Sequence, residues 1–266
     1  MSAATPTVAR LDRGYVEVVG PDAEDFLERM LSNEIASLEV GPEARPALLL
    51  TPKGRLIASF RVVREQPDSF LLITDTAELA GPVAETLQRS RFASKCEIKV
   101  LPWDGYVHFD GEPGPGRVRN TDYGVEAVET WGPRGVAPSS APDAAQLEGL
   151  RIEAGTPAWG KELDENVLPA EAGLDRTHIS FTKGCYPGQE PIARLHHRGH
   201  VNRGLRVLSI DRAEPGADII WNDKVVGRVT SAVPGRALGY VRTEVPTDAD
   251  LLVSGAVATL ASPTRP

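Results

Sequence analysis

Several chemically active side chains lie close together in residues 183–190, whose sequence is KGCYPGQE. A thiol, an amine, an amide and a carboxylate fall within these eight residues, and two glycines and a proline interrupt them. Gly184, Pro187 and Gly188 disfavour a regular helix or a central strand, so the stretch is predicted to be a turn or an irregular loop. Because loops held by a rigid scaffold often carry function, this loop is the first candidate site.

Cys185 is the candidate functional thiol of this loop. A free cysteine with a pKa of about 8.5 is only a few per cent thiolate at pH 7. Lys183 lies two residues earlier, and in a locally extended backbone both side chains would leave on the same face. A nearby ammonium would favour the thiolate and lower the thiol pKa. The alternative, a small buried cysteine beside a surface lysine, stays open.

Glu153 is a second candidate, within residues 151–155 (RIEAG). These residues are predicted to follow an apolar helix and to precede a long loop. A carboxylate accepts two hydrogen bonds side by side, which suits a planar heterocycle with adjacent N–H groups, such as a pterin or a guanine edge. An ordinary surface glutamate is the alternative.

Three histidines crowd into residues 195–200 (LHHRGH). His196 and His200 are four apart, as in helical zinc sites, but the glutamate of the zinc-protease motif is missing. Gly199 also breaks the helix that such a site needs. A polar loop made basic by Arg194, Arg198 and Arg203, which suits an anionic ligand tail, is therefore favoured, and no metal is assigned.

The composition is that of a soluble globular protein of 266 residues, with 41% hydrophobic and 25% charged content. Two or three compact units are expected at this length. The net charge of −8 disfavours broad nucleic-acid binding. Two distant cysteines, Cys96 and Cys185, make no disulfide framework and favour a reducing cytoplasm. With neither a signal peptide nor an apolar run long enough to span a membrane, no membrane association is expected.

Familiar cofactor motifs are missing from the sequence. There is no glycine-rich dinucleotide motif, no Walker loop and no Cys-x-x-Cys pair, which argues against a dinucleotide enzyme, an ATPase and a self-contained iron–sulfur site. An iron–sulfur cluster shared transiently between chains stays open.

The first half of the chain alternates predicted strands and helices. Lys53 and Arg55 flank the turn of a predicted hairpin, where a solvated turn is the simplest interpretation. The predicted elements are strands at 15–19, 47–50, 56–63, 70–74, 96–101 and 106–109, and helices at 21–31, 76–90 and 142–150.

The C-terminal part changes in character. After predicted loops at 111–117, 132–143 and 155–169, short β-rich stretches follow one another with Gly or Pro between them, which predicts a small all-β barrel or sandwich. These stretches are residues 205–210, 218–221, 224–233, 237–242 and 250–260.

In this order the motifs resemble the YgfZ-type folate-binding proteins, relatives of the aminomethyltransferase (T-protein) of the glycine cleavage system. Residues 183–190 are similar to the family's K-G-C-Y-x-G-Q-E motif, which is highly specific. More moderate similarities extend over most of the chain. They lie at residues 19–27, 50–55, 151–155, 226–231 and 238–242.

The resemblance implies an α+β, three-lobed aminomethyltransferase-like (T-protein-like) fold around a central folate-binding channel, with a small C-terminal β-barrel. It assigns residues 1–45 with 118–198 to a first α+β lobe, which carries Glu153 and the Cys185 motif. It assigns residues 46–117 to a second α+β lobe and residues 199–266 to the barrel.

The resemblance also implies tetrahydrofolate as the cofactor and a role in assembling or repairing iron–sulfur proteins, with iron–sulfur client or carrier proteins as partners. Cys185 is then the functional thiol, and Lys183 and Glu190 set its charge and orientation. Glu153 falls where the aminomethyltransferases hold the pterin ring. The other expected folate contacts are Tyr186, Gln189, Glu190, Arg194 and Arg198.

Two other functions stay open. A folate-dependent one-carbon transferase or demethylase would share the fold, but an ungapped placement puts Gly81 or Pro82 where those enzymes have a catalytic aspartate. The second alternative is a non-enzymatic scaffold that has kept the fold but no longer binds folate. We therefore expect an accessory protein rather than a conventional enzyme.

Overall fold

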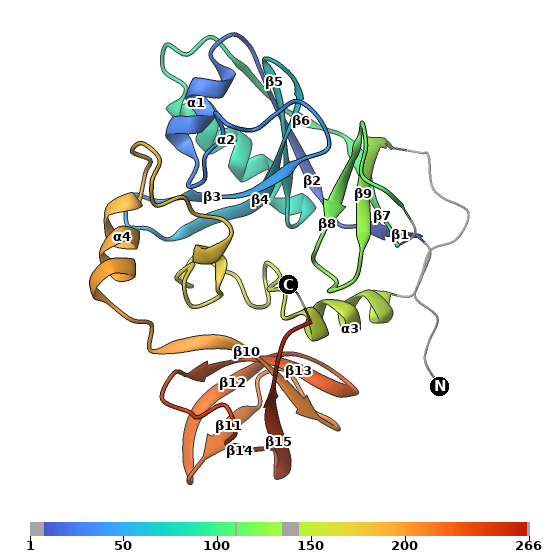
Figure 1. Cartoon of the computed structure of the whole chain (residues 1–266), viewed down its shortest axis with the longest axis vertical. Coiled ribbons are helices and arrows are strands. Elements are labelled where there is room, and N and C mark those ends of the chain that lie inside the picture. Colours follow the sequence, from blue (N-terminus) through green and yellow to red (C-terminus); the bar gives the residue numbers. More distant parts are fainter. Residues whose placement is uncertain (1–7, 110, 135–143, 265–266) are drawn as a thin grey trace. The chain divides into compact units, whose positions relative to one another are not determined.

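The computed structural model describes residues 8–109, 111–134 and 144–264, and these form two compact units (Figure 1). The first unit takes its described residues from Met1–Asn120, Ala127–Ala141 and Leu174–Arg198. The second takes its described residues from Thr121–Glu126, Pro142–Gly173 and Gly199–Pro266.

A five-stranded antiparallel sheet is the centre of the first unit, in the order β3-β4-β5-β2-β6. β2 lies between β5 and β6, and its residues Val16 and Val18 are fully buried, as its β-branched sequence predicts. The predicted hairpin is confirmed, and it joins β3 to β4. The bounds are β2 Gly14–Val19, β3 Ala44–Leu50, β4 Leu56–Gln66, β5 Ser69–Thr74 and β6 Glu97–Leu101.

A second, four-stranded antiparallel sheet, in the order β1-β7-β9-β8, packs on one face of the first. The core between the sheets joins Tyr15 and Ile73 of the larger sheet to Val118 and Trp131 of the smaller one. The sequence predicted only part of β7 in this sheet. Its strands are β1 Val8–Leu11, β7 Trp103–His108, β8 Arg117–Asn120 and β9 Ala127–Pro133.

Two amphipathic helices pack against the larger sheet in the first unit, α1 (Ala23–Met30) and α2 (Ala80–Ser90). α1 buries Phe26 and Leu27, and α2 buries Val83 and Leu87, which is the spacing of one helical face. Both predicted helices are confirmed. The first turn of the second is a 3₁₀ helix, Ala77–Leu79, because Pro82 restricts where the α-helix begins.

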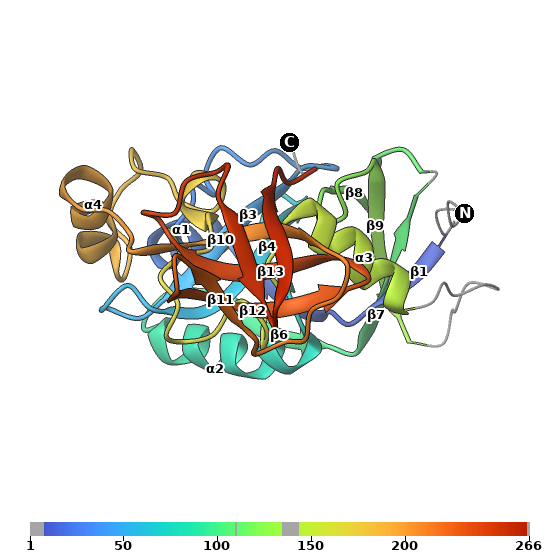
Figure 2. The same cartoon turned by 90° about the horizontal axis from the view of Figure 1, so that it is seen from below.

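The second unit contains a closed antiparallel barrel in the order β10-β13-β12-β11-β14-β15, with β15 pairing back to β10 (Figure 2). Alternate residues point inward, as in β14, where Leu251 and Val253 are fully buried. The predicted stretch 250–260 is two strands, because Ser254 and Gly255 form a turn with positive φ. The strands are β10 Arg203–Ile210, β11 Asp218–Trp221, β12 Lys224–Val233, β13 Gly235–Arg242, β14 Asp250–Val253 and β15 Ala256–Ala261.

Helix α3 (Ala144–Ala154) packs on the outside of this barrel through Ile152, which contacts Val207 and Leu238. Residues 155–169 then follow without a regular helix or strand, as predicted. Of the predicted loop at 132–143, residues 135–143 lie outside the described residues, and residues 132 and 133 belong to β9.

The α+β fold class and the small C-terminal barrel are confirmed. The larger sheet combines β2, from the first predicted lobe, with β4, β5 and β6 from the second. The boundaries of the three lobes stay a prediction. Across the described residues, none of the helices is both long enough and apolar enough to cross a bilayer.

Candidate functional site

The loop that carries Cys185 is irregular over residues 181–188, as predicted, and helix α4 (Gln189–Arg198) begins directly after it. Gly188 adopts a positive φ of 82°. A Cβ atom at this position would lie 2.5 Å from the carbonyl oxygen of Thr51 and 3.0 Å from the Cα of Gly54. Only glycine allows the loop to approach the β3–β4 turn this closely. The β3–β4 turn therefore packs directly against the backbone of the loop.

Cys185 is a free, exposed cysteine. The alternative of a buried structural cysteine is therefore wrong. The side chains on either side of it in the loop, Lys183 and Tyr186, are by contrast almost fully buried. The loop thus presents its thiol to solvent while its neighbours anchor it. The functional role of the thiol stays a prediction.

Lys183 is the anchor. Its ammonium Nζ donates to the carbonyl oxygens of Glu28 (2.6 Å), Leu31 (2.9 Å) and Asn33 (2.8 Å) and lies 3.1 Å from Oε1 of Glu28. The Glu28 carbonyl lies in the last turn of α1, and the Leu31 and Asn33 carbonyls follow the helix, so the lysine caps the end of α1 and fixes the chain that leaves it. Burial lowers the pKa of Lys183, and the Glu28 carboxylate opposes that shift. An ammonium has three N–H donors, and here each has a carbonyl partner.

Tyr186 is buried beside this anchor, with its ring centroid 5.7 Å from the Lys183 ammonium. Burial raises the pKa of its hydroxyl to about 12. That hydroxyl is buried and has no hydrogen-bond partner among the described residues. A buried donor without a partner is costly, so this hydroxyl is an unsatisfied polar group directly beside the anchor.

The basic loop predicted at 195–200 is wrong for residues 195–198, which belong to helix α4. Gln189 and Glu190 begin the helix, and Glu190 forms an exposed i,i+4 ion pair of 2.9 Å with Arg194. Phe181 stacks on His196 at a centroid distance of 3.8 Å, which ties the start of the thiol loop to the helix. Ile192 is the buried residue that holds α4 to its unit. Gly199 ends the helix before His200, as the argument against a helical zinc site expected.

The histidines of α4 serve packing in this structure. His196 stacks on Phe181, and His197 meets the His196 ring edge-on at 5.1 Å. Over the described ranges, no group of three or more His, Cys, Asp or Glu side chains is arranged to hold a metal ion.

Glu153 lies in the other compact unit, in the last turn of α3 rather than after a helix as predicted. The helix ends at Gly155, which adopts a positive φ of 71°. The carboxylate is 47% exposed and makes a long ion-pair contact, 3.9 Å from Nη2 of Arg236. Both oxygens of Glu153 therefore keep acceptor capacity for a pair of N–H donors.

Arg151, which the sequence did not single out, is the centre of a buried polar network in the same unit. Its guanidinium donates to Glu162 (2.8 Å), to the carbonyl oxygen of Thr156 (2.6 Å) and to the hydroxyl of Ser231 (2.9 Å). It also binds Glu148 through two hydrogen bonds, of 3.0 and 2.6 Å. The network joins α3 to the loop 155–163 and to β12, and so holds the element that carries Glu153.

The carboxylates of this network differ in exposure. Glu162 is fully buried, and its second oxygen accepts a 2.6 Å hydrogen bond from Ser231. Burial would raise the pKa of Glu148, but hydrogen bonds from Arg151 and Lys161 outweigh it and lower that pKa to about 2. Because of the two carboxylates, the pKa of Arg151 is raised despite its burial. Glu148 therefore stays ionised and Arg151 protonated at neutral pH.

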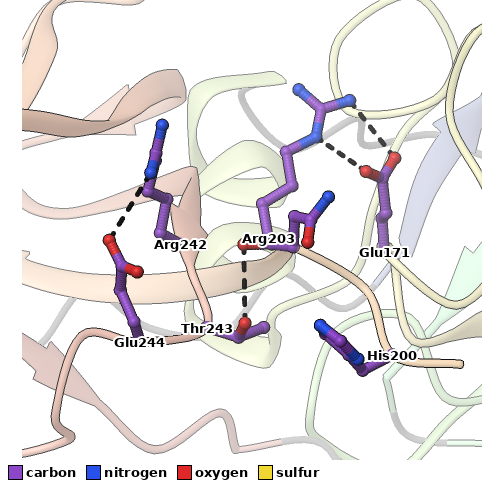
Figure 3. Close-up of a pocket in the computed structure, with 7 residues that line it drawn as sticks. Glu171, His200, Arg203, Arg242, Thr243 and Glu244 are labelled. Carbon is purple, nitrogen blue, oxygen red and sulfur yellow. Dashed lines mark hydrogen bonds and ion pairs between the residues drawn. The ribbon is translucent and has the colours of Figure 1, made fainter.

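A polar pocket of about 670 Å³ lies within the second unit at the start of β10 and the end of β13 (Figure 3). Arg203 and Arg242 are directly opposite each other on these strands. Glu171 binds Arg203 at 3.0 and 3.2 Å, and Glu244 lies 3.5 Å from Arg242. The Arg203 guanidinium also packs over the ring of Tyr240 at 4.7 Å. The volume suits a small polar ligand.

None of the predicted site residues lines this pocket. Of its lining, the sequence drew attention only to Arg203 and His200, as parts of a basic stretch. The carboxylate that pairs with Arg203 comes from position 171, and nothing in the local sequence signals that pairing. The lining residues are Glu171, His200, Asn202, Arg203, Arg242, Thr243 and Glu244.

Comparisons with known proteins place the fold. A family model described as the CAF17 C-terminal beta-barrel domain matches residues 201–265. The aminomethyltransferase of Streptomyces avermitilis is 26% identical over 278 residues, covering 85% of this chain and 73% of the relative.

A second relative is the mitochondrial iron–sulfur cluster assembly factor IBA57 homologue of Mycosarcoma maydis, 28% identical over 226 residues. That match covers 74% of this chain, which spans 55% of the relative's length. Among solved structures, the glycine cleavage system aminomethyltransferase T of Bartonella henselae superimposes with a TM-score of 0.84 at 19% identity, covering 97% of this chain and 85% of the other. At that identity the similarity shows the fold.

Proposed function

We propose, from the premise that this chain belongs to the aminomethyltransferase-like (T-protein-like) family of the YgfZ and IBA57 type, that it is a tetrahydrofolate-binding accessory protein for the assembly or repair of iron–sulfur proteins. The relative named as an iron–sulfur cluster assembly factor supports this role. The aminomethyltransferase-like fold supports the folate. The partners would be iron–sulfur client or carrier proteins.

The observation that carries the proposal is the exposed thiol of Cys185 on an anchored loop. A thiolate that either accepts a one-carbon unit or contacts a labile cluster must be reachable from solvent and held in place. The carbonyl contacts of Lys183 and the close approach of Gly188 to the β3–β4 turn provide the fixed position. The two cysteines, Cys96 and Cys185, are both free, which agrees with the proposed reducing cytoplasm.

The residues of this chain fit a pterin at Glu153. Its carboxylate is half exposed and its long contact to Arg236 leaves acceptor capacity for adjacent N–H groups. When bound, tetrahydrofolate would supply or accept a one-carbon unit. Within the protein, Glu153 would orient the ring and the Arg151 network would hold α3 in place. Tyr186, Gln189, Glu190, Arg194 and Arg198 stay predicted folate contacts.

Folate binding is tested by titrating the purified wild-type protein and its Glu153→Ala variant with tetrahydrofolate. We expect at least a ten-fold weaker affinity in the variant, because two charge-assisted hydrogen bonds are worth about 1.5–3 kcal/mol each. Glu165→Ala, an exposed carboxylate in the same unit, is the matched control. An unchanged affinity in Glu153→Ala would remove the pterin assignment.

The accessory role is tested by complementing a strain that lacks the native protein with wild type and with Cys185→Ser. We expect wild type to restore iron–sulfur enzyme activity and the serine variant to fail at an unchanged melting temperature. Full restoration by Cys185→Ser would contradict the role of the thiol and would favour a scaffold without that chemistry.

A folate-dependent one-carbon transferase or demethylase is the second candidate, because the Streptomyces avermitilis relative is an aminomethyltransferase. Gly81 and Pro82 lie in the first turn of α2 and bring no carboxylate there. Turnover of an amine donor by the purified protein with tetrahydrofolate would favour this candidate over the accessory role.

A further inference from the structure

Basic side chains on the β3–β4 turn and on α4 adjoin the two ends of the loop of Cys185, and we propose that they dock an acidic face of the iron–sulfur partner protein. The inference deepens the proposed function and rests on it. We call this patch the α4 basic surface. It comprises the exposed side chains of Lys53, Arg55, Arg194, His196, His197 and Arg198.

The charge of this surface is opposite to that of the whole chain. The hairpin turn 51–55 and α4 together carry four Lys or Arg side chains and one carboxylate, Glu190. The chain as a whole has a net charge of −8. A positively charged patch on a negatively charged protein attracts a partner with an acidic face and orients it during the encounter.

The two halves of the surface are in contact. Lys53 and Arg55 flank Gly54, and a Cβ atom on Gly54 would lie 3.0 Å from the ring of Pro191 in the first turn of α4. The carbonyl oxygen of Gly188 lies 3.4 Å from the same point. The cations of the hairpin and those of the helix therefore share one platform, although about 140 residues separate them in sequence.

The thiol loop is held between the two halves. At one end, Gly188 packs on the backbone of the hairpin turn; at the other, Phe181 stacks on His196 of α4. Cys185 lies between these two tethers. A partner seated on the cations would therefore bind beside the fixed loop that exposes the thiol.

An acidic protein face fits better than a nucleic acid. The surface is small, and the chain's net charge of −8 would repel an extended polyanion. It also combines cations with the exposed ring of Pro191 and with stacked aromatic rings, which is a composition typical of protein interfaces. Because the ion pair between Glu190 and Arg194 is exposed, Arg194 can leave Glu190 and bind a carboxylate of the partner at little cost in free energy.

The test is charge reversal of the hairpin half by the double variant Lys53→Glu with Arg55→Glu, which leaves the predicted folate contacts untouched. The matched control is Arg212→Glu with Lys224→Glu, two exposed cations of the barrel unit. We expect the hairpin variant to lower the restored iron–sulfur enzyme activity by about ten-fold, as loss of electrostatic steering predicts. The control should restore activity like wild type, and both should keep wild-type melting temperature and folate affinity.

A photo-crosslinking residue at position 197 identifies the occupant in cells, with position 257 of the barrel as the control site. We expect an iron–sulfur protein with an acidic face to be captured at 197, and the capture to be lost in the hairpin variant. Binding of a short single-stranded DNA that is lost in the same variant would overturn the inference in favour of a nucleic acid.

The outcomes separate this inference from the proposed function. Failure of wild type to restore activity removes the function itself. Restoration by both wild type and the hairpin variant leaves the function standing and removes only the docking surface. If the hairpin variant is unstable, Lys53→Gln with Arg55→Gln replaces it, with a smaller loss expected in the same direction.

Discussion

Lys183 and Arg151 are both buried cations, and their surroundings shift their pKa values in opposite directions. Lys183 is 1% exposed among three neutral carbonyls with one carboxylate at 3.1 Å, and burial lowers its pKa. Arg151 is 10% exposed between the carboxylates of Glu148 and Glu162, and its pKa is raised. Burial alone therefore does not decide the direction in which the pKa of a cation shifts, because carboxylates around the cation can outweigh it. The lysine closes the end of a helix, and the arginine balances charges that are themselves buried.

The largest effect is expected from Arg151→Met. The substitution leaves the fully buried Glu162 without its counter-charge, which costs about 3–5 kcal/mol in the free energy of unfolding. Denaturation in urea with wild type alongside measures the loss. Arg151→Lys is the matched control: it keeps the charge but not the fork that binds two carboxylates, so a smaller loss is expected. A loss below about 1 kcal/mol in Arg151→Met would show that the network is not a charge-balancing one.

Lys183→Met is expected to cost less, about 2–3 kcal/mol, because it leaves neutral carbonyls rather than a buried charge unpaired. Lys53→Met, on the exposed hairpin turn, is the control and should change the free energy of unfolding by no more than about 0.5 kcal/mol. A cost equal to that of Arg151→Met would break the comparison.

The pH dependence sharpens the same contrast on the alkaline side. The pKa of Lys183 is lower in the folded state than its ordinary value of 10.5, so the unfolded chain binds more protons between those two values. Wild type should therefore gain stability relative to Lys183→Met as the pH rises toward 10.5. A flat difference between the two proteins would contradict the lowered pKa.

A smaller effect is expected from Glu148 on the acid side. Its pKa is about 2 in the folded state against an ordinary 4.5, so its stabilisation is complete above pH 4.5 and is lost as the pH falls toward 2. Because the side chain is partly exposed, we expect about 1–2 kcal/mol, less than the full shift would give. Urea denaturation of wild type and Glu148→Gln between pH 2 and 4.5 measures this stabilisation. Free energies of unfolding that change in parallel with pH in the two proteins would refute it.

The smallest effect is expected from the exposed pair of Glu190 and Arg194 on α4. A double-mutant cycle to alanine should give a coupling of about 0.3–0.5 kcal/mol that disappears in high salt. A coupling comparable to that of the buried networks would mean that the pair is shielded from solvent.

Much of the fold was predictable because its elements follow local rules. β2, the β3–β4 hairpin and the strands of the barrel carry alternating apolar residues, and they are confirmed, except that the predicted strand 250–260 is two strands. The loop of Cys185 followed from its glycines and proline. β8 and β9 were missed, since their burial depends on packing against the larger sheet rather than on a clear alternation of their own.

The helix α4 was missed for a related reason. Its sequence mixes histidines and arginines with one buried residue, Ile192, and the glycines on either side of the helix, Gly188 and Gly199, favoured a loop. What stabilises it is contact with the β3–β4 turn and with Phe181. Both contacts lie outside the helix, and a reading of the helix sequence alone does not include them.

By itself, the amino-acid sequence determined where the thiol loop and the barrel lie, because glycine and proline geometry and the two-residue period of a strand act on neighbouring residues. Only the tertiary structure decided that Lys183 closes the end of α1, up to 155 residues away, and that Arg151 pairs across to Ser231, 80 residues away. The physical reason is that burial and charge pairing depend on which distant groups meet. That information appears only once the chain has folded.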